Sequence, residues 1–263
     1  MLPRELGDSL PPAAREGSER SYLDAYTARI ALTARRRWLR CNGPITGHAT
    51  CRPAGSLTRV EPDAADPTVG LVLLARPGDP GLRTLVAALA PSFDDVLVIL
   101  DATDARPVPR ARTIVRPLGG DFAAQRNAAQ AALVTDWALH LDTDERPDAE
   151  LLGALRPLCR LAGEDGIRAI GLRRRNMVDG CMSALYPDTQ YRLLRAGERF
   201  ENRVHERPVA CRDWTRTTIW LDGGLVHHLT AERVEHRHET YGRMGQDAER
   251  DGDRAALLAP FPA

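Results

Sequence analysis

Three apolar runs between positions 69 and 141 constrain the fold of this chain more than any other feature. Val69–Leu74, Val96–Leu100 and Trp137–Leu141 are short enough for strands and apolar enough to be buried on both faces of a sheet. Helical patterns separate them, and Arg112–Val115 supplies a further strand. Strands that alternate with helices imply crossover connections and a mostly parallel sheet. We therefore expect an α/β fold.

The helix and strand signals change along the chain. Asp79-Pro80 is typical of a helix start, because a capping side chain precedes proline at the first helical position. Further helices are predicted over Phe122–Val134 and Pro147–Leu161. After position 166 long helices are no longer predicted between the strands, which are expected at Ile167–Arg174, Gln190–Leu194, Arg199–His205 and Thr217–Leu221. This pattern indicates a mixed or antiparallel extension of the sheet.

The predicted sheet sets the domain boundaries. Residues 1–20 are charged and proline-rich, which is typical of a disordered leader. Residues 21–67 form an N-terminal extension, with a helix expected over 21–40 and irregular structure or short strands after it. The sheet domain spans 68–230, and residues 231–263 form a C-terminal helix and tail.

The composition excludes several classes of protein. The formal net charge is zero, from 36 basic and 36 acidic residues, whereas a general nucleic-acid binder has a basic excess. The N-terminus lacks the apolar core of a secretory signal. No run reaches the roughly 18 apolar residues of a membrane span. Five cysteines without a repeated spacing fit a reducing compartment, so we expect a cytoplasmic protein.

Carboxylates follow two of the predicted buried strands. One strand runs into Asp101 and Asp104, and another runs into Asp142 and Asp144. Two acids that leave one strand end together repel each other unless a cation joins them. Mg²⁺ and Mn²⁺ prefer oxygen ligands and often bridge to a diphosphate. The pattern favours a metal–diphosphate site at the carboxyl edge of the sheet, although capping of the helix from Pro147 would also explain Asp142 and Asp144.

Several motifs together resemble glycosyltransferase family 2. They occur in the family's order at positions 122–129, 136–145, 186–195, 199–206 and 224–228. The resemblance covers roughly residues 68–230 and is similar in detail to the branch of lipopolysaccharide-core and bacterial glycan glucosyltransferases. It implies a GT-A fold, which is a Rossmann-like, mostly parallel sheet flanked by helices. It also implies an inverting mechanism and a UDP-linked or similar sugar donor.

The resemblance also implies a set of donor-binding residues. By match to the family, Asp101 contacts the nucleobase or ribose, and Asp104 belongs to the same motif. Arg126 and Asn127 line the nucleotide pocket. Asp142 touches the ribose or the metal ion.

The same resemblance implies a bound Mn²⁺ or Mg²⁺ ion. Asp144 is the expected ligand, together with Asp142. His227 and His228 follow a predicted strand, and one of them completes the metal shell if it is not an ordinary hydrogen-bonded histidine. His228 is the histidine that we assign to the metal.

An inverting transfer needs a carboxylate that takes the acceptor's proton while the metal neutralises the departing diphosphate. Glu206 occupies about the place where the family keeps this base, and Asp188 is the second candidate. An exposed glutamate paired with Arg203 or Arg207 would explain Glu206 equally well.

The functional prediction is an inverting transferase that moves a sugar from a nucleotide-diphosphate sugar to a glycan precursor, a peptide or a natural product. Two other functions stay open. A sugar nucleotidyltransferase needs a glycine-rich phosphate loop with a lysine, and the chain contains no lysine. A catalytically impaired nucleotide-sugar-binding protein is the other, because Arg76-Pro77 stands where most relatives carry Asn-Glu. Arg76 is itself able to meet a phosphate.

Overall fold

A mixed β-sheet organises the part of the chain that the computed structural model describes, which is residues 37–41, 55–186, 188–203, 206–242 and 251–261. Its strands in these ranges are β3 (Val69–Ala75), β4 (Asp95–Leu100), β5 (Arg112–Val115), β6 (Trp137–Asp142), β7 (Glu145–Pro147), β8 (Ala169–Val178), β9 (Cys181–Met182), β10 (Asp188–Arg195) and β13 (Thr217–Leu229). Their order is β5-β4-β3-β6-β10-β8-β13-β7, with β9 beside β8. The predicted α/β class with a mixed C-terminal extension is confirmed.

The first half of the sheet is parallel. Strand β3 pairs in parallel with β4 and β6, and β4 pairs in parallel with β5. The alternation along β3 divides the core, because Leu71 and Leu73 belong to a large apolar cluster and Val72 to a second, smaller one. Burial on both faces explains why the run is continuously apolar rather than alternating.

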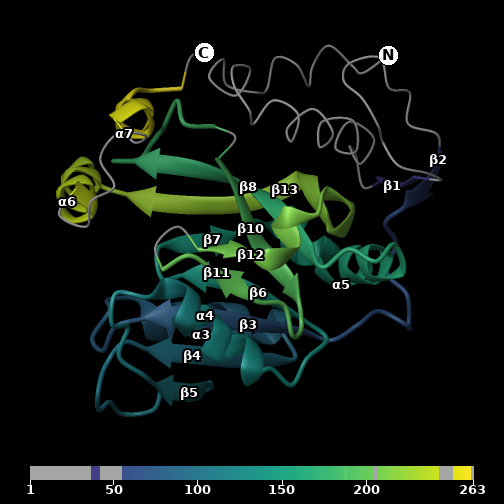
Figure 1. Ribbon diagram of the computed structural model, residues 1–263, viewed down its shortest axis with the longest axis horizontal. Helices are drawn as coiled ribbons and strands as arrows, with labels where there is room; N and C mark the ends of the chain where they lie inside the picture. Colours follow the sequence, from purple (N-terminus) through teal and green to yellow (C-terminus); the bar gives the residue numbers. More distant parts are fainter. Residues whose placement is uncertain (1–36, 42–54, 187, 204–205, 243–250, 262–263) are drawn as a thin grey trace.

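Helices cover both faces of this parallel half (Figure 1). Leu85 and Leu155 join the cluster of Leu71, whereas Ala129 joins that of Val72. The described helices are α3 (Leu82–Leu89), α4 (Phe122–Ala131), α5 (Ala149–Glu164), α6 (Ala231–Gly242) and α7 (Asp251–Leu258), with short 3₁₀ turns at Ala90–Ser92, Val209–Arg212 and Trp214–Arg216.

The predicted start of α3 is wrong by a few residues. The side chain of Asp79 accepts a hydrogen bond from the backbone N–H of Arg76, so it stabilises the turn before the helix rather than the helix itself. Gly81 occupies the N-cap with a φ of 84°, a conformation that favours glycine. The helix therefore begins at Leu82.

The other two predicted helices also shift at their ends. In α5 the N-cap is Asp148, which accepts from the N–H of Leu151 at 2.9 Å, and Pro147 belongs to β7. The helix thus runs from Ala149 to Glu164. Helix α4 ends at Ala131, and Val134, which the prediction included, is exposed. Neither Asp142 nor Asp144 caps α5, so helix capping does not explain that pair of acids.

The second half of the sheet is mixed, as the loss of long helices predicted. Strand β10 is antiparallel to both β6 and β8, and β13 is parallel to β8. Strand β13 carries a bulge between Trp220 and Gly224. A Cβ atom at Gly224 would lie 2.1 Å from the carbonyl oxygen of Arg173, so only glycine fits there.

One strand prediction is confirmed only in part. Within the described positions 199–203 of the expected strand 199–205, Phe200–Glu201 forms strand β11, which pairs with β12 (Arg207–Pro208). Positions 204 and 205 lie outside the described residues. Phe200 is buried against Leu194 on β10, so packing fixes this short element beside the main sheet.

The helix predicted over residues 21–40 is wrong at its described positions. Positions 37–40, expected at the end of a helix, belong to strand β1 (Arg37–Cys41), which pairs with β2 (Gly55–Arg59) in an antiparallel ladder. Pairing with β2 satisfies the backbone groups that a helix would satisfy within itself. The expected leader at 1–20 and the helix over 21–36 lie outside the described residues.

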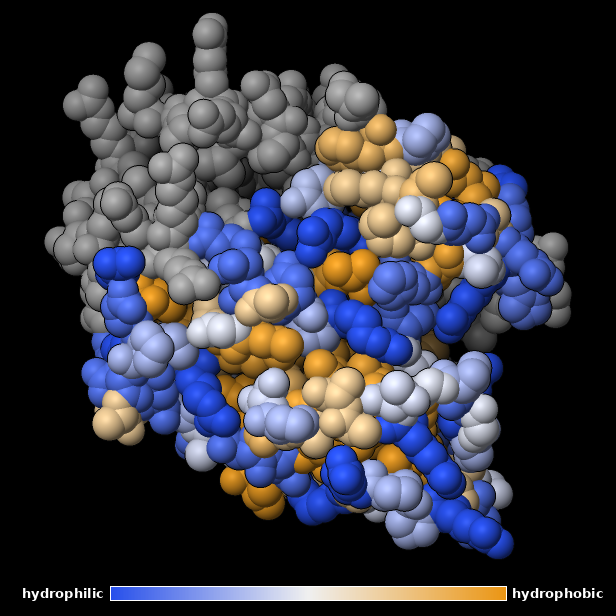
Figure 2. Space-filling model, turned by 180° about the vertical axis from the view of Figure 1, so that it is seen from behind, coloured by the Kyte–Doolittle hydropathy of each residue, from blue (hydrophilic) through white to orange (hydrophobic). Residues whose placement is uncertain are grey.

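Helices α6 and α7 lie at the carboxyl ends of β8 and β13 (Figure 1). The far face of the molecule in Figure 2 carries an apolar area over α7 and the segment after it, where Leu258 and Phe261 are exposed. No helix in the described part of the chain is long and apolar enough to cross a membrane.

Candidate functional site

The carboxyl ends of β4 and β6 flank that of β3, and acids lie at both. Leu100, the last residue of β4, pairs with Ala75, and Asp142, the last residue of β6, pairs with Leu74. Asp101 therefore follows on one side of β3 and Asp142 lies on the other. The structure thus brings these two predicted residues to the edge where parallel sheets bind ligands.

Asp101 has one carboxylate oxygen fixed by the backbone. Its Oδ1 atom accepts a hydrogen bond of 2.8 Å from the N–H of Leu118, and its Oδ2 atom lies 3.7 Å from Nε of Arg76. Arg76 is largely exposed and Asp104 is exposed in the turn that follows. Asp101 is oriented at the edge, where its Oδ2 atom meets the cation of Arg76.

Arg126 is buried at the base of this edge and holds two acids. Its Nε atom donates to Oε1 of Glu206 at 2.6 Å, and its Nη2 atom donates to Oδ1 of Asp142 at 3.1 Å. Only 1% of the side chain is exposed. A buried guanidinium between two carboxylates is compensated in charge, so it fixes both acids in place, although its Nη1 atom has no hydrogen-bond partner among the described residues.

Asn127 lies elsewhere. Its side chain donates to the carbonyl oxygen of Phe200 and accepts from the N–H of the same residue, at 2.9 and 2.8 Å. These two bonds join α4 to β11. The structure therefore places Asn127 on the backbone of Phe200, whereas its neighbour Arg126 lies on Asp142 and Glu206.

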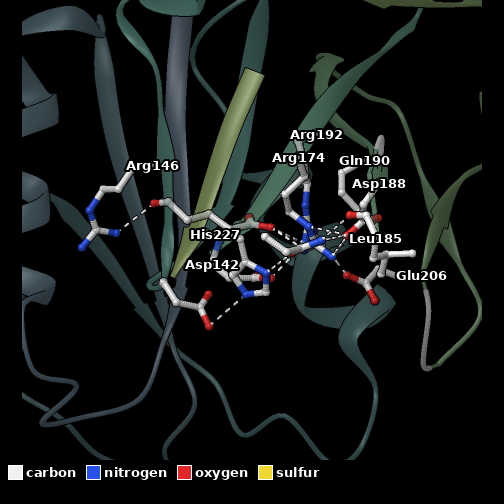
Figure 3. A network of polar contacts seen from close by, with 12 residues as sticks. Asp142, Arg146, Arg174, Leu185, Asp188, Gln190, Arg192, Glu206 and His227 are labelled. Carbon is white, nitrogen blue, oxygen red and sulfur yellow. Dashed lines mark hydrogen bonds and ion pairs between the residues drawn. The ribbon is translucent and has the colours of Figure 1, made fainter. Parts of the chain in front are cut away.

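Arg192 is a second buried guanidinium in the site. Its Nη2 atom lies 2.8 Å from Oδ2 of Asp142 and 3.4 Å from Oε1 of Glu145, and its Nη1 atom lies 3.6 Å from Oε1 of Glu206. Figure 3 shows Arg192 and Arg174 extending side by side toward these acids. Both oxygens of Asp142 thus meet guanidinium groups.

Glu145 joins Asp142 to Arg174 and Arg192. It is fully buried; its Oε2 atom accepts from the N–H of Asp142, and its Oε1 atom meets Nη1 of Arg174 at 2.8 Å. The neighbouring acids Asp144 and Glu145 therefore differ in their contacts. Glu145 stabilises the turn after β6, whereas Asp144 faces His227.

Asp188, the second candidate base, accepts hydrogen bonds from three side chains. Arg174 donates twice to its Oδ2 atom, Asn176 donates to the same atom at 3.0 Å, and Gln190 donates to Oδ1 at 2.6 Å. Burial by itself raises the pKa of Asp188, but the charge of Arg174 and these donors outweigh it and hold the pKa below its ordinary value. Asp188 is a fixed carboxylate that orients its neighbours (Figure 3).

The side chain of His227, rather than that of His228, lies beside the carboxylate of Asp144. Its Nε2 atom is 3.3 Å from Oδ2 of Asp144, and its Nδ1 atom is 2.8 Å from Oδ1 of Asn176. His228 is the next residue on strand β13, where side chains alternate between faces, and its side chain is exposed. The structure therefore brings the neighbour of the predicted histidine to the predicted carboxylate.

Asp144 is nearly buried beside His227 and Arg233. Burial raises its pKa, but the contacts with His227 and the charge of Arg233 outweigh this effect and lower the pKa of Asp144. Arg233, from the first turn of α6, places Nη2 3.0 Å from Oδ2 of Asp144. The same carboxylate oxygen thus faces both a ring nitrogen and a guanidinium, which marks it as a position for positive charge.

The pair of Asp144 and His227 fits a divalent metal ion. Two ligands at right angles around an octahedral ion, with bonds of about 2.1 Å, lie about 3 Å apart. The 3.3 Å between Oδ2 of Asp144 and Nε2 of His227 is close to that spacing. No group of three or more His, Cys, Asp or Glu side chains able to hold a metal occurs in the described ranges, so the remaining ligands would be phosphate oxygens and water. Asp142 fits less well as a ligand, because its two oxygens face the buried Arg126 and Arg192, whereas the arginine at Oδ2 of Asp144, Arg233, is half exposed.

The sequence prediction assigned no role to three residues of this arrangement, Arg192, Glu145 and Asn176. It considered His227 and His228 for the metal shell and assigned His228, whereas the structure places the side chain of His227 beside Asp144. A period of two along β13 would have placed His227 on an inward-facing position. Arg192 lies where the register of β10 with β8 shifts, so a simple alternation could not have placed it. Asn176 had no comparable signal, because its partner lies 51 residues away.

Comparison with known protein families gives no match, and no curated protein matches the chain. Among solved structures the chain is similar to TarS of S. aureus, at 10% identity and a TM-score of 0.43, over 73% of this chain and 42% of that one. It is also similar to TarS 1-349, at 12% and 0.40 over 73% and 70%, and to TarS 1-349 in complex with UDP-GlcNAc, at 11% and 0.39 over 72% and 70%. The chain thus spans less than half of the longer TarS chain.

Proposed function

We propose that this chain is an inverting glycosyltransferase that uses a nucleotide-diphosphate sugar, UDP-linked by resemblance, and a divalent metal ion. The observation that carries the proposal is the pairing of Asp144 with His227 at the end of the strand that also carries Asp142. A carboxylate and an imidazole at this spacing suit Mn²⁺ or Mg²⁺ with a diphosphate. The motifs that resemble glycosyltransferase family 2 support the same reading.

The donor is assigned to the edge between Asp101 and Asp142. The oriented carboxylate of Asp101 suits hydroxyl or N–H groups of a nucleoside, and the exposed guanidinium of Arg76 beside it suits a phosphate. Asp144 and His227 would hold the metal ion, which neutralises the diphosphate as it leaves. Replacement of the family's Asn-Glu by Arg76-Pro77 therefore adds positive charge on the phosphate side of the site.

Glu206 is the proposed general base. Both guanidinium contacts of its carboxylate engage Oε1, so we assign proton acceptance to Oε2. Asp188 is less suitable, because Arg174, Asn176 and Gln190 already donate to it. The acceptor is a hydroxyl of a glycan precursor, a peptide or a natural product.

The direct test is to incubate the purified chain with UDP and a panel of UDP-sugars, with and without Mn²⁺. The measurements are thermal stability and slow hydrolysis of the sugar donor. A ligand that binds the native state raises the melting temperature by mass action. We expect stabilisation that requires Mn²⁺ and hydrolysis that Glu206→Gln abolishes.

Two outcomes separate the alternatives. Stabilisation without hydrolysis or transfer would favour the binding-protein function. No effect of any nucleotide sugar, including donors linked to other nucleotides, would sink the transferase proposal.

A further inference from the structure

We infer that Asn176 is a positioning residue that fixes His227 in the tautomer able to bind a metal ion, and that Asp188 fixes Asn176 in turn. The inference rests on the metal-assisted transferase proposed above and extends it to a residue on β8 that the resemblance does not assign. The three side chains form one line of contacts that ends at Asp144.

The neighbours of Asn176 determine which way its amide points. Its Nδ2 atom lies 3.0 Å from Oδ2 of Asp188 and 3.3 Å from the carbonyl oxygen of Leu185. Both partners accept hydrogen bonds, and a carboxylate cannot donate one, so the NH₂ end must face them. The opposite end, Oδ1, then faces His227. Figure 3 shows Asp188 and Leu185 together on this side of the network.

The oriented amide determines the tautomer of His227. Oδ1 of Asn176 accepts only, so the proton of the 2.8 Å contact must belong to Nδ1 of the ring. In the neutral ring this leaves Nε2 with a lone pair. Nε2 faces Oδ2 of Asp144 at 3.3 Å, and that atom is an acceptor as well. Arg233 already donates to Oδ2 from one side, but two acceptors this close still require a proton or a cation between them. A second proton on the ring would make an ion pair, and a metal ion bound to both atoms would satisfy them with the ring neutral.

The backbone makes the arrangement rigid. Asn176 and His227 are direct partners in the parallel pairing of β8 with β13, and Asp188 begins β10 on the other side of β8. Asn176 is fully buried and His227 is 3% exposed. Bulk water therefore cannot replace the amide oxygen. Partners of this kind around metal-bound histidines hold the ring and are worth about 10–100-fold in metal affinity.

The experiment measures the affinity for Mn²⁺ alone by electron paramagnetic resonance, without a sugar donor. Asn176→Leu keeps a similar volume but removes both polar atoms. We expect it to weaken Mn²⁺ binding by about 10–100-fold. In a His227→Ala background the same change should add less than about twofold, because its effect passes through the lost ring. His228→Ala is the matched histidine control and should leave the affinity unchanged.

The double-mutant comparison separates positioning from general destabilisation. Unchanged Mn²⁺ affinity in Asn176→Leu, or equal losses with and without His227, would overturn the inference. If the leucine variant does not fold, Asn176→Ala is compared in the same two backgrounds with the same expected result. If the parent protein binds no Mn²⁺ and still turns over the donor in the presence of a chelator, the inference is overturned, but the protein is still a transferase. Asn176-dependent Mn²⁺ binding without any donor binding supports the inference and rejects the transferase.

Discussion

Nε of Arg126 lies 2.6 Å from Oε1 of Glu206, although the two residues are 80 positions apart in the sequence. The same guanidinium contacts Asp142, the last residue of β6. Helix α4, which carries Arg126, therefore joins the proposed base to the strand end that we assign to the donor. Arg126 thus connects Glu206 to the end of β6.

Replacement of Arg126 by methionine should destabilise the fold. The change removes one of the two buried guanidinium groups that contact Glu206 and Asp142 and leaves Arg192 as the other. Loss of one partner from a buried ion pair costs about 3–5 kcal/mol of unfolding free energy, and the partial exposure of Asp142 favours the lower end. Denaturant unfolding measures the difference. The matched control is Arg156→Met, which removes a partly exposed pair with Asp94 and should cost at most about 1 kcal/mol. Equal losses in the two variants would mean that Arg126 does not hold the site together.

Asp101→Ala should weaken binding of UDP and of a UDP-sugar by similar factors. The proposed contact of Asp101 is with the nucleoside, which the two ligands share, and a hydrogen bond to a charged group is worth about 1.5–3 kcal/mol, or roughly 10–100-fold in affinity. Calorimetric titration with both ligands measures the two factors. Asp104→Ala, a change at the exposed neighbouring acid, should have little effect on either. A loss confined to the sugar-bearing ligand would place Asp101 near the sugar instead.

The parallel half of the fold was predictable because burial on both faces leaves a continuous apolar run in the sequence. Val69–Ala75 and Trp137–Asp142 carry that signal. The topology of a parallel sheet then places the acids that follow its strands at the carboxyl edge. Helix ends were less predictable. Asp79 and Asp148 look alike as capping residues, yet Asp79 bonds to a preceding turn and Asp148 to its helix.

The polar network could not be predicted from the sequence, because its members come from strands that are far apart in the chain. Asp142, Asp144 and Glu145 are adjacent in one motif, but each faces a different set of partners from distant strands. Only the register of β8 with β13 decides that His227 rather than His228 points inward beside Asn176. A shift of one residue would exchange the two histidines.

The stability of the protein should depend on pH through Asp188. Its pKa is lowered in the folded state from an ordinary value of 3.8, so the folded state favours the ionised form. The stabilisation is complete above the unfolded pKa and is lost as the pH falls through the lower, folded pKa. The free energy of unfolding between about pH 5 and pH 2 should therefore fall less steeply in Asp188→Asn than in the parent. Identical slopes would show that Asp188 is not held as described.

Glu206→Gln should abolish transfer while it preserves donor binding. Glutamine keeps an oxygen that can accept from Arg126, so the fold should lose only about 1–2 kcal/mol of unfolding free energy. It cannot take a proton from the acceptor, and loss of a general base lowers the rate by about two to four orders of magnitude. The measurements are single-turnover transfer and Mn²⁺-dependent affinity for the UDP-sugar, which should stay near the parent value. Glu201→Gln, five residues earlier and paired with Arg212 outside the site, is the matched control and should transfer at the parent rate.

If Glu206→Gln transfers normally and Asp188→Asn does not, Asp188 is the base and Glu206 serves to hold Arg126 and Arg192. If both variants transfer at the parent rate, neither carboxylate takes the proton, and the base must be sought on another residue of the site.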